Sequence, residues 1–388
     1  FLPTMSIDKT GVIVGDGQVN YTSYPGLIPN NLTWEKVTTY DVGVDVDMFK
    51  NRLTIGFDWY RRNTTDMYTV GPTLPEVLGT TQPKGNYANL KTKGWELILS
   101  WRDNFKLAGS DFHYGVKFML WDSQSWITKY NNATGKLSDY YEGYRIGDIW
   151  GYNIEGLFTS YDEIANHADQ DYIKISDSKI WQPGDLKFAD LNGDGKIDKG
   201  AQTLSDHGDL VIVGNEEERY HYGFNLNVGW KGIGISAFFQ GVGKRDWYPG
   251  QETGFFWGKY NRPYGYSLKM HENRWTEENP NPNAYWPRLV GYSSENGGRP
   301  MGTPNNRYMQ DASYLRLKAL TVDYSLPQAW VSKLGLTGLK IYFTGENLFT
   351  FSNICENFDP EVIKGGDVDL KDRKGEEQGY SYPMLKTY

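Results

Sequence analysis

Residues 222–239 read YGFNLNVGWKGIGISAFF and alternate regularly between apolar and polar or small residues. From Tyr222 to Trp230 every second residue is apolar, and glycine or asparagine lies in between. Alternation with a period of two is typical of a β-strand that has one apolar and one polar face. Lys231-Gly232 interrupts the pattern, which resumes at Ile233. The stretch therefore predicts two antiparallel strands joined by a two-residue turn.

The same alternation recurs along the chain and predicts about eight strands. They cover residues 42–48, 53–60, 95–101, 114–120, 222–230, 233–239, 314–326 and 339–348. Within each successive pair the connection is short, at residues 50–51, 103–110, 231–232 and 327–338. Between the pairs, and after the last one, lie long segments at residues 61–91, 121–217, 242–311 and 351–379. Loops of this length are uncommon inside compact domains, so their regular placement is informative.

Two architectures explain the alternation equally well: a soluble sandwich with an apolar core, and a membrane barrel with a polar interior. The connections favour the barrel, because outer-membrane barrels have short periplasmic turns and long extracellular loops. Aromatic residues such as Trp59, Trp95 and Trp230 lie near the ends of predicted strands, where barrels carry aromatic girdles. We therefore predict an all-β fold, a transmembrane antiparallel β-barrel whose long segments are extracellular loops.

Composition excludes several other classes of protein. The chain has 388 residues, a net charge of -8 and 15% aromatic residues, and Cys355 is its single cysteine. No run of about 18 apolar residues occurs, which excludes a membrane-spanning helix. One cysteine cannot form an intrachain disulfide. The negative charge disfavours nucleic acid as a partner, because phosphate binding needs a basic surface.

The sharpest local motif is DLNGDGKID at residues 190–198. It fits the first nine positions of an EF-hand-like calcium loop, with oxygen donors at alternate positions and glycine at the sixth. The predicted calcium ligands are Asp190, Asn192, Asp194, Lys196 through its carbonyl, and Asp198.

Position 12 of that loop, where a carboxylate belongs, is Ala201, and Asp206 or Asp209 would have to replace it. The alternative is a tight turn without an ion. We expect calcium here as a structural ion rather than a catalytic one.

Aromatic residues are frequent in the long predicted loops. Exposed aromatic rings suit sugar rings, peptide side chains or a protein partner, whereas a long loop also needs aromatic residues for its own packing. The candidates for cargo binding are Trp150, Trp247, Tyr248 and Trp257. The five histidines show no metal-ligand spacing, and no nucleophile, Walker or dinucleotide motif occurs, so we predict that the protein is not an enzyme.

Short motifs follow one another in a fixed order along most of the chain. They are NLTWE (31–35), GVD (43–45), NRL (51–53), DWY (58–60), TTDM (64–67), GDLKF (184–188), DLNGDGKID (190–198), YGFN (222–225), FQG (239–241), SYLRLK (313–318), DYSLP (323–327), GENL (345–348) and DPE (359–361). This series resembles the SusC/RagA-type TonB-dependent outer-membrane transporters.

The resemblance implies a 22-stranded barrel with an N-terminal plug. Residues 1–388 would be its C-terminal portion, with about 8–10 strands and with the plug and N-terminal regions absent. It further implies import of an oligomeric nutrient, glycan or peptide, across the outer membrane of a Gram-negative bacterium. The implied partners are a SusD-type surface lipoprotein, TonB through the absent N-terminal segment, and the lipid bilayer. The alternative function is a secreted, calcium-dependent β-sandwich that binds or cleaves carbohydrate.

Overall fold

The computed structural model describes residues 5–22, 29–30, 32–71, 77, 82–173, 180–250, 253–260, 265–290, 300–363 and 383–388. Strands dominate this part of the chain, and its α-helices have only four or five residues each. In the ranges just given, we find no helix that combines the length and the apolar character needed to cross a membrane.

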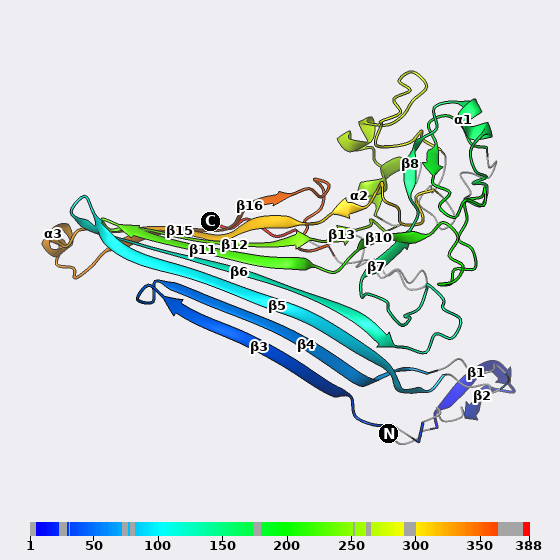
Figure 1. Ribbon diagram of the computed structural model, residues 1–388, viewed down its shortest axis with the longest axis horizontal. Helices are drawn as coiled ribbons and strands as arrows, with labels where there is room; N and C mark the ends of the chain where they lie inside the picture. The colour runs from blue at the N-terminus through cyan, green and yellow to red at the C-terminus, as the bar shows by residue number, and fades with distance from the viewer. Residues whose placement is uncertain are drawn as a thin grey trace. The chain divides into compact units, whose positions relative to one another are not determined.

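Eight long strands form one antiparallel sheet (Figure 1). In chain order they are β3 (Lys36–Met48), β4 (Leu53–Val70), β5 (Lys84–Leu107), β6 (Ser110–Lys129), β11 (Arg219–Trp230), β12 (Ile233–Lys244), β15 (Tyr314–Ser325) and β16 (Lys340–Ser352). Their order in the sheet is β16-β15-β12-β11-β6-β5-β4-β3, so each strand pairs with its neighbours in the sequence. All eight predicted strands are therefore present.

Residues with positive φ build the tight turns between the paired strands. Lys231 and Gly232 have φ values of 48° and 82°, and Ala108 and Gly109 have φ values of 47° and 77°. Positive φ at both central residues is the requirement of a type I′ hairpin turn, whose twist matches that of the strands. The prediction of a longer connection at 103–110 is wrong, because β5 continues to Leu107.

The strands extend well beyond their predicted bounds. β5 has 24 residues, which at about 3.3 Å per residue is a length of about 80 Å. As a result the first long connection spans residues 71–83 rather than 61–91, the second 130–218 rather than 121–217, and the third 245–313 rather than 242–311. The fourth begins at 353 rather than 351, and its residues 364–379 lie outside the described part. The predicted bounds are too short because the strands continue into segments with polar residues on both faces, where the apolar alternation has already stopped.

The chain divides into two compact units, and strands β3 to β6 contribute residues to both. The first unit contains residues 1–41, 60–93 and 124–145. It includes a separate hairpin of β1 (Ile7–Val14) and β2 (Gly17–Thr22), whose side chains are nearly all exposed. An ion pair joins Lys36 and Asp66 at 3.2 Å in the same unit.

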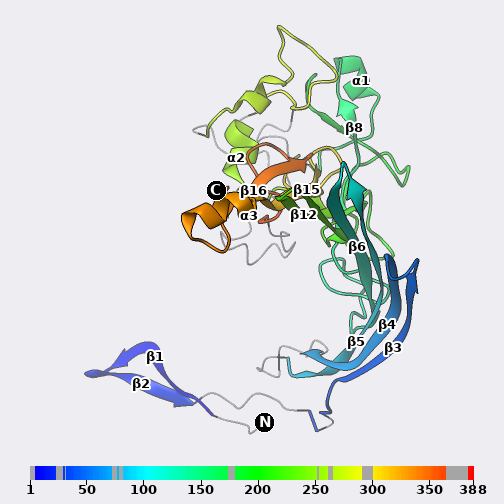
Figure 2. The same cartoon turned by 90° about the vertical axis from the view of Figure 1, so that its left-hand side faces the viewer.

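The second unit contains residues 42–59, 94–123 and 146–388. Two of its connections, at residues 146–218 and 245–313, fold together into what we call the loop lobe. Figure 2 shows α1, α2 and β8 within it. Its elements are β7 (Asp148–Gly151), β8 (Ile154–Leu157), α1 (Tyr161–Ala165), β9 (Leu186–Phe188), β10 (Val211–Asn215), β13 (Asp246–Trp247), α2 (Gly254–Trp257), η2 (Gly258–Tyr260), η3 (Lys269–Glu272) and β14 (Gln310–Asp311).

The short connection between β15 and β16 contains α3 (Gln328–Val331) and η4 (Ser332–Leu334). It lies at the opposite end of these strands from the loop lobe (Figure 1). Within the second unit, long and short connections are therefore segregated to opposite ends of the sheet.

Candidate functional site

One face of the sheet is apolar and exposed. On β16 the exposed fractions are 62% for Ile341, 50% for Phe343, 58% for Phe349 and 63% for Phe351. Large contiguous apolar surfaces on a folded chain mark contact with a membrane or a partner. This face is therefore built to be covered by something other than water.

Aromatic rings gather on the apolar face close to the hairpin turns. Phe105 and Phe112 have ring centroids 5.0 Å apart, and Trp101 donates a hydrogen bond of 2.9 Å to the hydroxyl of Tyr114. At the next hairpin the Lys231 ammonium lies 4.5 Å from the centre of the Trp230 ring. A belt of amphipathic aromatic side chains is the arrangement found at membrane–water interfaces.

On the opposite face, strand pairing brings polar residues into rows across the second unit. One row contains His113, Gly229, Gly234, Asp323 and Tyr342. The adjacent row contains Gly115, Asn227, Ser236, Thr321 and Thr344. Hydrogen bonds join Ser236 to Asn227 at 2.9 Å and Thr321 to Thr344 at 3.1 Å. We call this surface the polar face.

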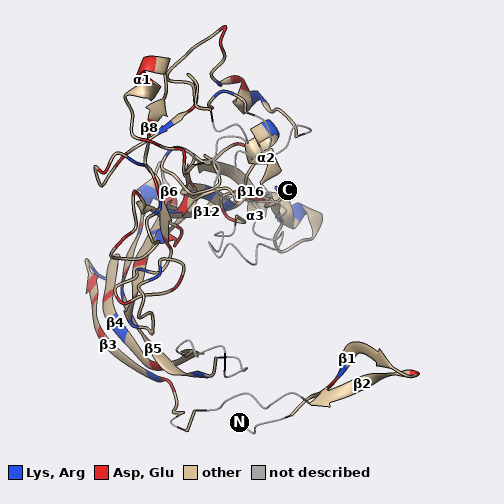
Figure 3. Cartoon of the chain, turned by 90° about the vertical axis from the view of Figure 1, so that its right-hand side faces the viewer, with Lys and Arg blue, Asp and Glu red and all other residues tan. Residues whose placement is uncertain are grey.

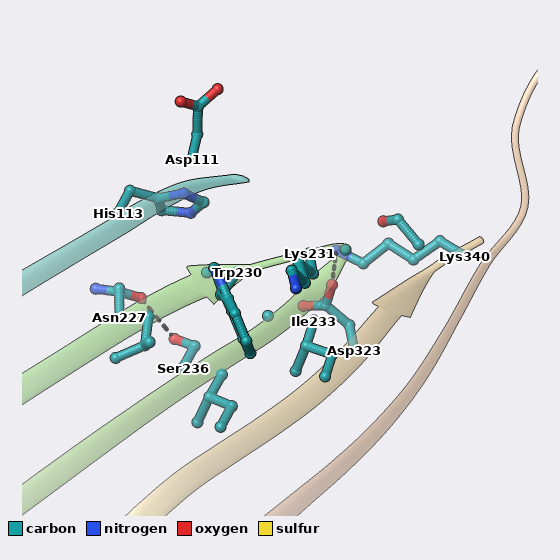
Figure 4. A pocket seen from close by; sticks show the side chains of 15 residues that line it. Asp111, His113, Asn227, Trp230, Lys231, Ile233, Ser236, Asp323 and Lys340 are labelled. Carbon is teal, nitrogen blue, oxygen red and sulfur yellow. Dashed lines mark hydrogen bonds and ion pairs between the residues drawn. The ribbon is translucent and has the colours of Figure 1, made fainter. Parts of the chain in front are cut away.

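The first of these rows forms a recess of about 470 Å³, drawn in Figure 4. Its floor is glycine: a Cβ on Gly229 would lie 2.1 Å from the ring of His113, and one on Gly234 would lie 2.5 Å from the Asp323 carboxylate. Lys340 pairs with Asp323 at 3.0 Å. The recess thus presents both signs of charge and suits a polar ligand or chain segment rather than an apolar one.

Further along the sheet, Asp45 on β3 and Asp58 on β4 also share a face. A Cβ on Gly43 would meet the carboxylate of Asp58, and one on Gly56 would lie 3.1 Å from that of Asp45. Two glycines therefore make room for two acidic side chains on adjacent strands.

The four aromatic candidates for cargo binding differ in exposure. Trp257 is completely buried and Trp247 is 1% exposed, so both rings serve the packing of the loop lobe. Trp150 and Tyr248 are half-buried. Tyr248 donates to the carbonyl of Met301 at 2.9 Å. Only Trp150 and Tyr248 retain ring surface for a ligand.

Trp286 is the centre of the packing in the loop lobe. It is fully buried and lies between Tyr260 and Tyr308, with ring centroids at 5.1 and 5.2 Å and interplanar angles of 16° and 21°. Its indole nitrogen donates to the carbonyl of Met270 at 3.0 Å. Offset aromatic stacking of this kind adds to the free energy gained from burial.

His271 packs beside Trp286 and makes the loop lobe sensitive to acid. Its Nδ1 accepts from the backbone of Leu268 at 2.9 Å, and its Nε2 donates to the carbonyl of Phe256 at 2.8 Å. Burial lowers the pKa of His271, so the folded lobe favours the neutral ring. The unfolded chain takes up a proton near pH 6.5, so this contribution to stability is complete above about pH 6.5 and decreases as the pH falls below it.

We expect amide exchange in residues 265–290 to accelerate between pH 7.5 and 5 after correction for the intrinsic rate. Replacing the exposed His113 by glutamine should leave this pH dependence unchanged. Equal protection at both pH values would contradict the proposed role of His271 in the acid sensitivity of the loop lobe.

The predicted calcium loop folds as a compact turn. Asp190 accepts backbone hydrogen bonds from Gly193 and Gly195 at 2.7 and 2.9 Å. Asp209, which is completely buried, accepts from the backbone of Leu191 at 2.8 Å and of Asp198 at 2.9 Å. A carboxylate eleven residues beyond position nine thus closes the turn, and Ala201 takes no part in that closure.

Within the described ranges, no group of three or more His, Cys, Asp or Glu residues is arranged to hold a metal ion. The donors of the turn include Asn192 and the carbonyl of Lys196, and each bonded carboxylate oxygen has a second lone pair. The donor set is thus chemically suited to calcium, whereas its carboxylates are already engaged by the chain itself.

The GDLKF motif anchors the loop lobe. Asp185 is 1% exposed and pairs with Arg288 at 2.6 Å; burial nevertheless raises its pKa to about 6. Leu186 and Phe188 are buried, while Lys187 between them pairs with Glu163 at 2.9 Å. Alternation along β9 therefore separates a buried apolar side from an exposed ionic side.

Two features of the sheet were not found from the sequence. Arg219 forms a buried, bidentate ion pair with Asp122, 97 residues earlier in the chain. Arg316 is 2% exposed and pairs with Asp359 and Glu361. Arg316 belongs to the SYLRLK motif, and Asp359 and Glu361 belong to the DPE motif. The presence of both motifs in the series was the only sequence signal that could have pointed to this ion-pair cluster.

The comparisons with known proteins agree with this two-faced sheet. The family described as "TonB dependent receptor-like, beta-barrel" matches residues 9–195. TonB-dependent receptor P3 of Formosa agariphila is 27% identical over 97% of this chain and 36% of its own length. TonB-dependent receptor SusC of Bacteroides thetaiotaomicron is 25% identical over 95% of this chain and 34% of its own length. The solved structure of the RagAB peptide transporter superposes with a TM-score of 0.63 at 20% identity, over 90% of this chain and 35% of that one.

The resemblance to SusC/RagA-type TonB-dependent receptor barrels is confirmed. The chain spans about a third of the length of the curated relatives it matches. Its eight-stranded sheet accordingly resembles part of the wall of such a barrel, with β3 and β16 as its edge strands.

The β-sandwich alternative is wrong. A sandwich needs two sheets packed face to face, each providing half of an apolar core. Here all eight long strands belong to one sheet in sequence order, and the apolar residues of β16 are exposed. In the receptor barrel that apolar face is the one that meets lipid, and the polar face lines the interior.

Proposed function

We propose that the receptor barrel imports an oligomeric nutrient, a glycan or a peptide, across the outer membrane of a Gram-negative bacterium. The observation that carries this proposal is the two-faced sheet: an exposed apolar face on β16 and rows of polar side chains on the other face. A barrel built in this way encloses a polar conduit within lipid. Import needs a conduit, a binding vestibule and a gate, so the proposal assigns no catalytic residue.

The proposed partners are a SusD-type surface lipoprotein and TonB. Support comes from the names of the similar proteins: SusC is a TonB-dependent receptor, and RagAB is a peptide transporter. The loop lobe provides a surface for a protein partner. Figure 3 shows acidic residues on its helix α1, where Asp162 and Glu163 occupy the first turn. For contact with cargo we propose Trp150 and Tyr248, the two candidates that are not fully buried.

Growth on defined nutrients tests the import function. A strain that lacks the receptor should fail to grow on one class of oligomer, glycan or peptide, and should grow normally on the monomers. The proposed SusD-type lipoprotein partner should bind the same oligomer. Fractionation provides an independent check, since the receptor should require detergent to leave the outer membrane. Unchanged growth of the deletion strain on all glycans and peptides tested, or a receptor that is soluble without detergent, would contradict the proposal.

We also propose that the turn at residues 190–198 binds calcium as a structural ion, with Asp209 in place of the carboxylate missing at Ala201. Calorimetric titration of the receptor with calcium should show binding, and Asp190→Ala should weaken it at least tenfold. Asp162→Ala, an exposed acidic residue in the same lobe, is the matched control and should bind as the unaltered protein does. Absence of heat in the unaltered receptor would identify a turn without an ion.

A further inference from the structure

Arg316 projects from the polar face of the sheet although it is almost completely buried. It pairs with Gln240 on β12 and with Thr350 on β16. Gln240 in turn pairs with Gly223, which shares a face of β11 with Asn225 and Asn227. A side chain in this position of a barrel points toward the interior, where it would ordinarily be wet. Its exposure of only 2% means that something covers it from the inside.

The cover is the segment that follows β16, residues 353–363. Asp359 and Glu361 of this segment bind the guanidinium of Arg316 at 2.5 and 2.6 Å, and Glu361 also binds Lys318 at 2.8 Å. The Nε of Arg316 donates to the hydroxyl of Thr350 at 2.9 Å. Two cations and two carboxylates therefore form one neutral, largely buried cluster. We call it the Arg316 cluster.

Apolar contacts hold the same segment against the loop lobe. Phe358 packs on Trp247 with ring centroids 5.0 Å apart, and the carbonyl of Pro360 accepts from Arg245 at 3.5 Å. Ile354, Phe358 and Ile363 are less than a tenth exposed. The segment is thus packed against the loop lobe through buried apolar side chains.

A buried ion pair adds little net stability, but removal of one partner leaves an uncompensated buried charge and is strongly destabilising. If Arg316 were removed, two buried carboxylates would lose their main cation. The cluster therefore fixes where the segment lies.

We propose that residues 353–363 form an inward-folded constriction of the conduit, held against the barrel wall by the Arg316 cluster. The proposal rests on the import function and adds a size limit to it: the constriction restricts the length or width of the oligomer that passes. The interiors of some outer-membrane barrels are plugged by loops or by a helix, so a loop that folds inward has precedent in this class of fold.

The test measures release of the segment and passage of cargo separately in the full-length receptor. Cys355 lies within the segment, is partly buried and contacts the sulfur of Met270 at 3.3 Å. Its reaction with a maleimide, followed on its own peptide by mass spectrometry, reports release. Accumulation of labelled oligomers of increasing length by whole cells reports the size limit. We expect Arg316→Met to accelerate labelling at least tenfold and to admit longer oligomers.

Two further variants make the result specific. Arg219→Met breaks another buried ion pair of the same unit, with Asp122, and should change neither readout. Arg316→Lys restores one ion pair and should give an intermediate labelling rate. Should Arg316→Met fail to assemble, Glu361→Gln, which keeps the size of the side chain, should give the same changes to a smaller degree.

The outcomes separate this inference from the proposed function. Faster labelling with an unchanged size limit would overturn the constriction while import stands. Unchanged labelling in both Arg316→Met and Glu361→Gln would show that the cluster does not hold the segment. No accumulation of any oligomer by the unaltered receptor would overturn the import function together with its size limit.

Discussion

Trp286→Ala is expected to unfold the loop lobe and to leave the strands in place. The substitution removes a fully buried indole from between the rings of Tyr260 and Tyr308. Replacing a buried tryptophan by alanine typically costs about 3–5 kcal/mol, because both the transfer free energy and the packing around the cavity are lost. Protection of amides in residues 254–260 and 265–290 should therefore fall by about two to four orders of magnitude in hydrogen exchange.

The strands and a second tryptophan are the controls for this experiment. Amides of β11 should exchange as they do in the unaltered receptor, because the backbone bonds of that strand lie in the sheet. Trp330 of α3 is 61% exposed, so Trp330→Ala should change stability by no more than about 0.5 kcal/mol. Loss of protection in β11 as well would mean that lobe and sheet unfold as one unit.

Gly184→Ala should have the second largest effect. Gly184 has a φ of 89°, a conformation that costs other residues about 1–2 kcal/mol. A Cβ there would also lie 2.3 Å from the ring of Trp275, and such overpacking costs about 1–3 kcal/mol more. The backbone bonds of Gly184 to Phe158 and Arg288, at 2.7 and 2.9 Å, should therefore be lost first.

Gly193 provides a matched control that separates the cost of the positive φ from the cost of contact with Trp275. It has a φ of 75°, but a Cβ at this position would meet no atom within 4 Å. Gly193→Ala should thus show the backbone cost alone. The measurement is hydrogen exchange of the amides beside each substituted glycine: those of residues 184 and 288 in Gly184→Ala, and those of Asp194 and Gly195 in Gly193→Ala. Equal loss in the two variants would show that contact with Trp275 adds nothing.

The strands could be predicted from the sequence because alternation is a local property. All eight predicted segments lie inside observed strands or within a residue of their ends. The strand ends were missed where alternation stops: residues 61–70 and 84–91 carry polar residues on both faces, as strands do that extend beyond an apolar layer. Hydrogen bonding to a neighbouring strand extends them, and that is not encoded in hydropathy.

The site residues also divide into those that follow from local alternation and those that depend on contacts between distant segments. The polar positions of β11 and β12 follow from alternation, whereas the burial of Trp247 and Trp257 depends on the folding of segments far apart in the sequence. Asp209 illustrates the same limit. The sequence left Asp206 and Asp209 as alternatives for the carboxylate missing at position 12, and only the folded chain shows that Asp209 closes the turn.

The amino-acid sequence alone predicted a two-faced antiparallel sheet in which short turns alternate with long connections. It could do so because period-two alternation and turn residues act over a few residues. The burial of Arg316 and the division of the tryptophans into buried and half-buried residues arise in the tertiary structure. Those outcomes depend on ion pairs and ring contacts between residues tens of positions apart, and no local pattern specifies such contacts.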